Sequence, residues 1–217
     1  MNSGPSATNR SDASVRDIAG EFGDIDIYLF DQLQKGRISA TDRVLDAGCG
    51  SGRNSYYLLS QGVDVSGVDT NPTAVAGLQE LAGELGRPAG SDRFRVEPLE
   101  ALTFDSGLFD VVICSAVLHF ARDDEHFEAM MRELWRVLRP GGMFFARLAS
   151  TIGIESQVRR IAGRRFALPD GSERYLVDEP QLMSLMATLG GQLLDPIKTT
   201  IVQDQRSMTT WVIRKAR

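Results

Sequence analysis

The sequence is poor in the residues that cross-link small proteins or bind metals. It has two cysteines, Cys49 and Cys114, and two histidines, His119 and His126, in 217 residues. Two cysteines allow at most one internal bridge, so no disulfide framework is implied. The spacing of these four residues matches no metal-ligand cluster, so we expect no metal site. A stable core must come from apolar packing, for which the 42% of hydrophobic residues suffices.

Long apolar runs and an excess of positive charge are also missing. No segment approaches the ~20 consecutive apolar residues that a membrane span needs. The N-terminal residues are rich in Ser, Asn, Asp and Thr and hold no apolar core of a signal peptide. We therefore expect a cytoplasmic protein whose residues 1–15 form a disordered tail. The formal charge of −5 disfavours a nucleic-acid partner, because affinity for nucleic acid depends on neutralising phosphates, but it allows a local basic pocket.

Short apolar segments alternate with amphipathic ones through the first two thirds of the chain. The continuous apolar run at 109–114 is typical of a strand buried on both faces. Apolar residues recur at helical spacing over 127–138, which predicts a helix that ends before Pro140. This alternation predicts a Rossmann-like α/β fold: a mostly parallel sheet with helices on both faces. The strand-like runs 193–202 and 208–213 have no helix between them, so we expect a C-terminal antiparallel pair.

The most informative segment is the loop Gly48-Cys49-Gly50-Ser51-Gly52, between a predicted strand and a predicted helix. Ligands bind at the carboxyl ends of parallel strands, where this loop falls, and glycines let them approach the backbone closely. Asp46 ends the strand, and its carboxylate would repel a pyrophosphate but favour a ligand with an ammonium and a sulfonium. The G-x-G-x-G spacing also differs from the G-x-G-x-x-G of nicotinamide-dependent oxidoreductases, which disfavours that alternative.

Asp69 ends the next predicted strand, 17 residues after Gly52. A carboxylate in this place can accept hydrogen bonds from both hydroxyls of a ribose. The alternative is a helix-start residue, since Asn71 and Pro72 form a good helix N-terminus. The pairing of Asp69 with the glycine loop favours the ligand.

Several segments resemble the class I S-adenosylmethionine-dependent methyltransferases. Residues 44–52, VLDAGCGSG, resemble the family's motif I, and residues 109–112 and 134–142 resemble its later motifs. Together these segments span roughly residues 43–146. Three further segments are loosely similar to the tellurite-resistance methyltransferase branch: Gly52-Arg53-Asn54-Ser55, LTF at 102–104 and VLHF at 117–120. The resemblance implies S-adenosylmethionine as the cofactor and methyl transfer to a small-molecule acceptor as the activity.

The resemblance also implies roles for individual residues around the cofactor. The three loop glycines would contact its methionine end, Asp46 would orient its ammonium group, and Ser115 would border the methionine portion. Asp69 would hold the ribose, and Thr70 would flank the adenine.

Adenine recognition departs from the family pattern. Leu99 would lie near the adenine ring, as in the family. The position before it often holds an Asp that accepts from the adenine amino group, whereas this chain has Pro98. Glu97, Glu100 or a backbone carbonyl must then take that role.

The acceptor side is carried by fewer residues. His119, after the fourth predicted strand, is the one candidate for a general base at neutral pH. The alternative is a histidine hydrogen-bonded to the loop backbone. Arg147, after the fifth strand, could bind an anionic acceptor, with help from Arg164 and Arg165. A run of arginines is more often a solvated face, so the alternative stays open here too.

We therefore expect a single methyltransferase domain over residues 16–217. Its parts are an N-terminal helical cap at 16–42, a cofactor-binding core at 43–146, and an acceptor-side insertion and helix at 150–190. The cap could close over the cofactor as a lid through Tyr28, Lys35 and Arg37. Two other functions remain: a non-catalytic S-adenosylmethionine-binding protein, and a methyltransferase that acts on RNA. The oligomeric state is left open.

Overall fold

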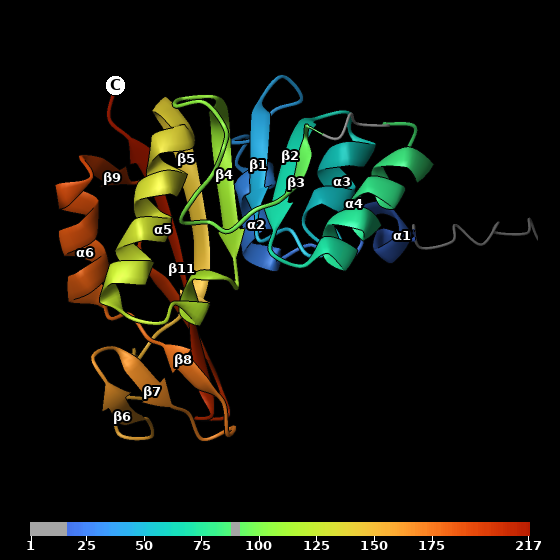
Figure 1. The fold of residues 1–217 in the computed structure, drawn as a ribbon. Helices are drawn as coiled ribbons and strands as arrows, with labels where there is room; N and C mark the ends of the chain where they lie inside the picture. The colour runs from blue at the N-terminus through green and yellow to red at the C-terminus, as the bar shows by residue number, and fades with distance from the viewer. Residues whose placement is uncertain (1–16, 88–91) are drawn as a thin grey trace, which may run out of the picture.

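The computed structural model describes residues 17–87 and 92–217, so the tail expected at 1–15 lies outside the described residues. Its centre is an eight-stranded sheet with the order β10-β11-β5-β4-β1-β2-β3, and β9 also pairs with β11 (Figure 1). Strands β1 to β5 pair in parallel, whereas β11 runs antiparallel to β5, β9 and β10. These pairings confirm the mostly parallel sheet and the C-terminal antiparallel pair. The strands of this sheet are β1 (Arg43–Ala47), β2 (Asp64–Asp69), β3 (Phe94–Val96), β4 (Phe109–Ser115), β5 (Leu138–Ala149), β9 (Gly191–Leu193), β10 (Lys198–Val202) and β11 (Arg206–Lys215).

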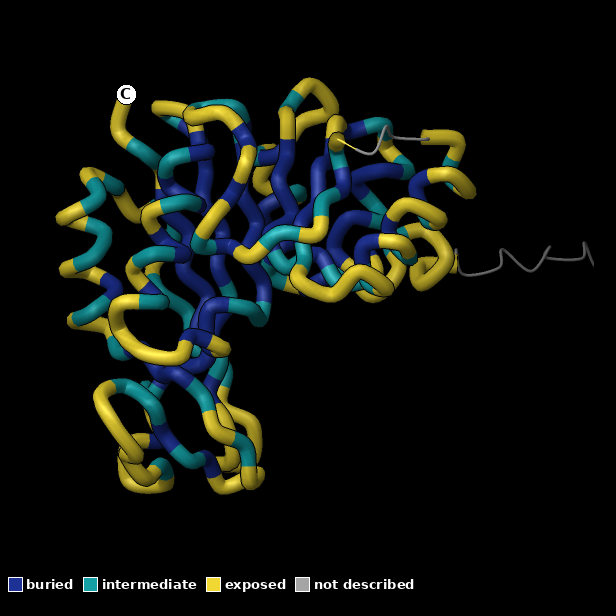
Figure 2. Tube along the Cα trace, viewed as in Figure 1, coloured by how far each residue is buried: buried dark blue, intermediate teal, exposed yellow. Residues whose placement is uncertain are grey.

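Helices cover both faces of the sheet and bury its side chains in two clusters, which Figure 2 shows as the dark blue interior. Leu29, Leu58 and Leu78 come from helices α2, α3 and α4 and pack on one face. Helices α5 and α6 cover the other face, to which they contribute Trp135 and Leu182. None of the helices described in 17–87 and 92–217 has the length and apolar character needed to cross a membrane. The helices are α1 (Ile18–Phe22), α2 (Ile27–Gln34), α3 (Ser55–Ser60), α4 (Pro72–Glu84), a 3-10 turn η1 (Leu118–Phe120), α5 (Asp124–Val137) and α6 (Glu179–Thr188).

The helix termini follow from their capping residues. Asn71 caps α4, because its side chain accepts from the Thr73 N–H at 3.0 Å, and Pro72 occupies the first helical position. Asp123 caps α5 in the same way, accepting from the His126 N–H at 2.8 Å. The apolar stripe of α5 is buried in the core, as its helical period predicts.

A second, smaller sheet escaped sequence prediction. Residues 150–178 show no clear period, yet they form the antiparallel strands β6 (Arg159–Ala162), β7 (Arg165–Ala167) and β8 (Glu173–Tyr175). This small sheet projects from the main sheet (Figure 1). Its strands have three or four residues and bury little, so no alternation could emerge from them.

The run 193–202 was wrongly predicted as one strand. It is divided between β9 and β10 by a turn at Asp195 and Pro196. Asp195 is held there by ion pairs with Arg37 at 2.7 Å and Lys35 at 3.0 Å.

Candidate functional site

A cavity of about 460 Å³ lies at the carboxyl ends of β1, β2 and β4. Its wall brings together five residues that the sequence placed at the cofactor: Gly48, Asp69, Thr70, Leu99 and Ser115. Strands that are adjacent in the sheet but distant in the sequence supply these residues, as expected for a parallel sheet. We call this space the first cavity.

The glycine loop is packed tightly against the end of the first cavity. Gly48 has φ +79°, and a Cβ on it would lie 2.2 Å from Cγ2 of Val117, which lines the same cavity. The N–H groups of Gly48 and Cys49 both donate to the Val68 carbonyl, at 2.8 and 2.9 Å. Gly50 also has a positive φ, but a Cβ there would meet nothing within 4 Å. The loop therefore requires glycine at 48 for packing and leaves open space beside 50.

Asp69 connects the loop to the cavity. One carboxylate oxygen accepts from the Gly50 N–H at 3.0 Å, and the other accepts from the Asn71 N–H at 2.9 Å. Asp69 thus accepts from the backbone at the start of α4 and also lines the cavity, which is compatible with both of the alternatives for this residue. Each carboxylate oxygen can accept more than one hydrogen bond, so capacity remains for a ligand's hydroxyls.

Asp46 lies behind the loop and not in the cavity wall. Its side chain is buried and accepts from Ser55 Oγ at 2.7 Å. Burial raises the pKa of Asp46 to about 6, against the Ser55 hydrogen bond and the Arg53 charge, which both lower it. The glycine loop therefore separates the Asp46 carboxylate from the cavity. Its charge can act on a ligand across the loop, but the carboxylate does not line the space in which an ammonium group would bind.

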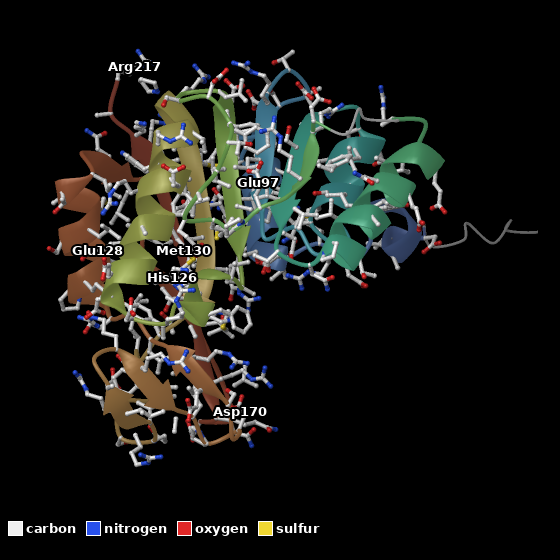
Figure 3. All side chains as sticks on the ribbon, viewed as in Figure 1. Glu97, His126, Glu128, Met130, Asp170 and Arg217 are labelled. Carbon is white, nitrogen blue, oxygen red and sulfur yellow. The ribbon has the colours of Figure 1, made fainter. Side chains whose placement is uncertain are left out.

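The end of the first cavity predicted to hold adenine carries Pro98, Leu99 and two acidic residues. Glu97 is already engaged, since it accepts from the N–H and the hydroxyl of Thr103. Glu100 lies 3.1 Å from Nε2 of His126 and is the less committed carboxylate. The side chain of His126 is only 12% exposed and lines the cavity. Figure 3 labels Glu97 and His126.

A second cavity, also of about 460 Å³, meets the first one at Ala116. Ala116 has φ +64°, a left-handed conformation that is uncommon for a residue with a Cβ and concentrates at functional sites. Its N–H donates to the Arg147 carbonyl at 2.7 Å, which fixes the ends of β4 and β5 together. Sequence reasoning missed Ala116, because backbone conformation at a single alanine leaves no sequence signal.

His119 and Arg147, the two predicted acceptor-side residues, both line the second cavity. Nδ1 of His119 accepts from the Ala149 N–H at 3.3 Å, so the neutral ring carries its proton on Nε2. Burial, together with the nearby Arg174, lowers the pKa of His119 to about 4. This arrangement favours a histidine bonded to the backbone, here to the end of β5 and not to the expected loop, over a general base.

Arg164 and Arg165 do not reach this cavity. Arg164 pairs with Asp178 at 2.9 Å, and Arg165 pairs with Glu173 at 3.2 Å. The arginine of the insertion that does line the second cavity is Arg174, from β8.

Asp26, which sequence reasoning also missed, ties α2 to the site. Its side chain is fully buried and accepts from Arg147 Nη1 at 2.9 Å and from Ser115 Oγ at 3.3 Å. Its own N–H donates to Asn54 Oδ1 at 3.0 Å, next to the glycine loop. The only sequence signal was an aspartate at the N-cap of a short helix, whose usual role is local.

Comparisons with known proteins agree with this geometry. Residues 45–146 match the Methyltransferase domain family. The uncharacterized methyltransferase YodH of Bacillus subtilis (strain 168) is 32% identical over 148 residues, 67% of this chain and 54% of that protein. The chain spans about half the length of the curated relatives it matches.

Two solved structures share the fold. The 1,6-didemethyltoxoflavin-N1-methyltransferase of Burkholderia thailandensis, with S-adenosylhomocysteine bound, has a TM-score of 0.67 at 23% identity, over 93% of this chain and 82% of that one. The cyclase SpnF has a TM-score of 0.64 at 18% identity, over 86% of this chain and 80% of that one.

The sheet order, the glycine loop and the cavity beside it define a methyltransferase fold of Rossmann-like type. Together with the match of residues 45–146 to the Methyltransferase domain family, they support an assignment of this chain to the class I S-adenosylmethionine-dependent methyltransferase superfamily. S-adenosylmethionine is the cofactor of that superfamily.

Proposed function

We propose that this protein transfers the methyl group of S-adenosylmethionine to a small-molecule acceptor. The observation that carries the proposal is the meeting of two cavities of similar volume at Ala116. One is lined by residues suited to a nucleoside and the other by residues suited to a second small molecule. Methyl transfer needs this juxtaposition, because donor and acceptor must be aligned at a single point.

The residues of the first cavity fit the cofactor. Asp69 has acceptor capacity for the ribose hydroxyls, and Leu99 and Thr70 line the space proposed for adenine. Glu100 lines the same space and, in this proposal, accepts from the adenine amino group. Ser115 and the glycine loop border the methionine end, with the buried charge of Asp46 behind them. That charge favours a cationic ligand, as the positions of the two carboxylates predicted.

Little acid–base chemistry is required of the protein. The bound cofactor supplies an activated methyl group, because a sulfonium is a good leaving group. His119 is neutral and presents a donor at Nε2, so in this proposal it orients the acceptor and does not remove a proton. Arg147 borders the acceptor, and Asp26 fixes its guanidinium in place.

The proposal keeps residues 16–217 as one domain, with a core at 43–146 and an acceptor-side insertion and helix at 150–190. It treats the cap at 16–42 as a fixed wall. Lys35 and Arg37, which we considered for a lid, pair with Asp195, and Leu29 of α2 is fully buried. Tyr28 alone of the three approaches the site, with its ring 5.4 Å from the Arg147 guanidinium.

Two measurements test the proposal. Calorimetric titration with S-adenosylmethionine and S-adenosylhomocysteine should show binding, and its absence for both ligands would refute the cofactor assignment. Transfer of a labelled methyl group should then be assayed over a panel of small molecules and over total RNA. Transfer to small molecules supports the proposal, transfer to RNA alone shifts the acceptor class, and binding without any transfer indicates a non-catalytic protein. The last outcome has to be considered because the cyclase SpnF has the same fold but is named for a different activity.

A further inference from the structure

We propose that the second cavity selects acceptors that carry a carboxylate or phosphate on an apolar body, and that Arg174 and Arg206 hold the anionic group. This inference deepens the proposed function and rests on it.

The second cavity has more cationic than anionic side chains. Four arginines line it: Arg53, Arg147, Arg174 and Arg206. Two carboxylates contact them. Asp26 lies 2.9 Å from Arg147 and 3.8 Å from Arg53, and Asp170 lies 3.8 Å from Arg206. Figure 3 labels Asp170 beside the small sheet. These four arginines and two carboxylates carry a net charge of +2, in a chain whose total formal charge is −5; Arg206 shares Asp170 at a long distance of 3.8 Å, and Arg174 has no carboxylate within ion-pair distance.

Arg174 is the arginine best placed to take a ligand. Its guanidinium stacks on the Phe120 ring, 4.9 Å from the centroid, and donates to the Glu173 carbonyl at 2.8 Å. Within the part of the chain that the structure describes, no carboxylate lies within ion-pair distance of it. A stacked guanidinium keeps its remaining N–H donors in a fixed plane, which suits the two oxygens of a carboxylate or phosphate.

The position of Phe120 connects this arginine to the reaction. Phe120 lines the first cavity, whereas Arg174, stacked on it, lines the second. An anion held by Arg174 therefore lies beside the wall that both cavities share. His119, which also lines the second cavity, adds a neutral donor to the same surface.

The rest of the lining is mainly apolar and limits the acceptor's size. Ala149, Leu168, Val202 and Met208 are its apolar residues, and Asp170 and Ser172 are polar. A cavity of about 460 Å³ accommodates a small organic molecule, and the apolar residues suit a hydrocarbon or aromatic body. A polynucleotide backbone would instead need an extended basic surface.

Arg53 is not assigned to the acceptor. Arg53 directly follows the glycine loop, so it could form an ion pair with the carboxylate at the methionine end of the cofactor. The inference therefore depends on Arg174 and Arg206, which come from β8 and β11 and are remote in sequence from the loop.

The test compares a charged probe with its neutral isostere on protein saturated with S-adenosylhomocysteine. Benzoate and phenyl phosphate should bind, with benzamide at least roughly tenfold weaker, since a charge-assisted hydrogen bond contributes about that factor. Arg174→Gln and Arg206→Gln should each weaken the two anions by roughly tenfold and leave benzamide unchanged. Arg159→Gln, at an exposed arginine on β6 of the same small sheet, is the matched control and should change nothing.

The outcomes separate this inference from the proposed function. If S-adenosylhomocysteine binds normally but benzamide binds as well as the anions, anion selection is overturned and the methyltransferase assignment stands. If Arg174→Gln weakens S-adenosylhomocysteine itself, the arginine serves the cofactor and the inference is also overturned. If S-adenosylhomocysteine does not bind the unaltered protein, the proposed function fails. Arg174→Lys, which keeps the charge without the planar fork, should recover only part of the anion affinity.

Discussion

The region around the first cavity, which we propose as the cofactor side, and the region around the second cavity, which we propose as the acceptor side, differ in how they are stabilised. On the cofactor side, the ends of β1 and β4 are buried, β2 ends at the half-buried Asp69, and the glycine loop is fixed by backbone contacts. On the acceptor side, all four residues of β6 are exposed (Figure 2). The second cavity is lined largely by arginines and loop residues. We therefore expect the first region to tolerate fewer substitutions than the second. The matched family domain accordingly ends at residue 146, before the small sheet begins.

The largest expected effect belongs to Gly48→Ala on the cofactor side. The new Cβ would lie 2.2 Å from Val117, on a residue with φ +79°. Left-handed strain and overpacking together should lower the free energy of unfolding by roughly 3–4 kcal/mol. Urea denaturation followed by circular dichroism measures this change.

Gly86→Ala is its matched control. Gly86 has φ +68°, but a Cβ there would meet nothing within 4 Å. It carries the strain without the clash, so it should cost only about 1–2 kcal/mol. Equal losses for the two variants would show that Val117 simply moves aside, and that the cofactor side is less rigid than the packing indicates.

Asp69→Ala should give the next largest effect, on binding. It removes the carboxylate that lines the cavity and holds the Gly50 N–H. Loss of charged hydrogen bonds to a ribose should weaken S-adenosylhomocysteine by about a hundredfold in calorimetry. Asp64→Ala removes an acid from the other end of β2, where it pairs with Arg93 on the surface, and should leave affinity unchanged. A similar loss in both variants would attribute the effect to the strand and not to the site.

The same difference explains what the sequence could predict. Asp46, Gly48 and Asp69 stand out because backbone geometry demands particular residues at fixed spacing after a strand. Their arrangement at a common strand end follows from parallel pairing alone. The fact that Asp46 lies behind the loop does not, because it depends on the Ser55 hydrogen bond and on how deeply α3 packs.

The acceptor side was predictable only in outline. Arg174 was one of five arginines in an aperiodic segment, and which of them meets the cavity depends on how two short hairpins pair. The contact between Asp26 and Arg147 spans 121 residues and has no local signature. Long-range side-chain contacts of this kind determine the geometry of the proposed acceptor site, and they cannot be predicted from a single sequence.

Asp46→Asn should separate stability from function through pH. Burial raises the pKa of Asp46 from its ordinary 3.8 to about 6, so the folded protein binds this proton more tightly than the unfolded chain. That contribution is fully present below pH ~4 and is lost as the pH rises through about 6. Without the buried charge, the variant should be more stable than the unaltered protein by about 3 kcal/mol at pH 8, and equally stable at pH 4.

The same variant should bind the cofactor less well. S-adenosylmethionine affinity of the unaltered protein should rise between pH 5 and 7, as Asp46 ionises, and the variant should lack this rise. Parallel pH profiles of affinity for both proteins would exclude Asp46 as the source of the favourable field.

The smallest effect is expected at Tyr175→Phe, on the acceptor side. The Tyr175 hydroxyl donates to Asp124 at 2.7 Å and accepts from Gln181 at 2.7 Å, while its ring stacks on Phe127 of α5. Removing the hydroxyl keeps the aromatic stack and should lower the free energy of unfolding by about 1 kcal/mol.

The decisive measurement is which part of the molecule loses this stability. If the small sheet is held to the core by a few side chains, amide exchange should accelerate in β6–β8 and stay unchanged in β1 and β4. Tyr57→Phe, at a ring that contacts Phe22 far from this sheet, supplies the baseline for losing a hydroxyl. If amide exchange instead accelerates evenly in both sheets, the two sides unfold as one unit. The cofactor side and the acceptor side would then differ in sequence but not in local stability.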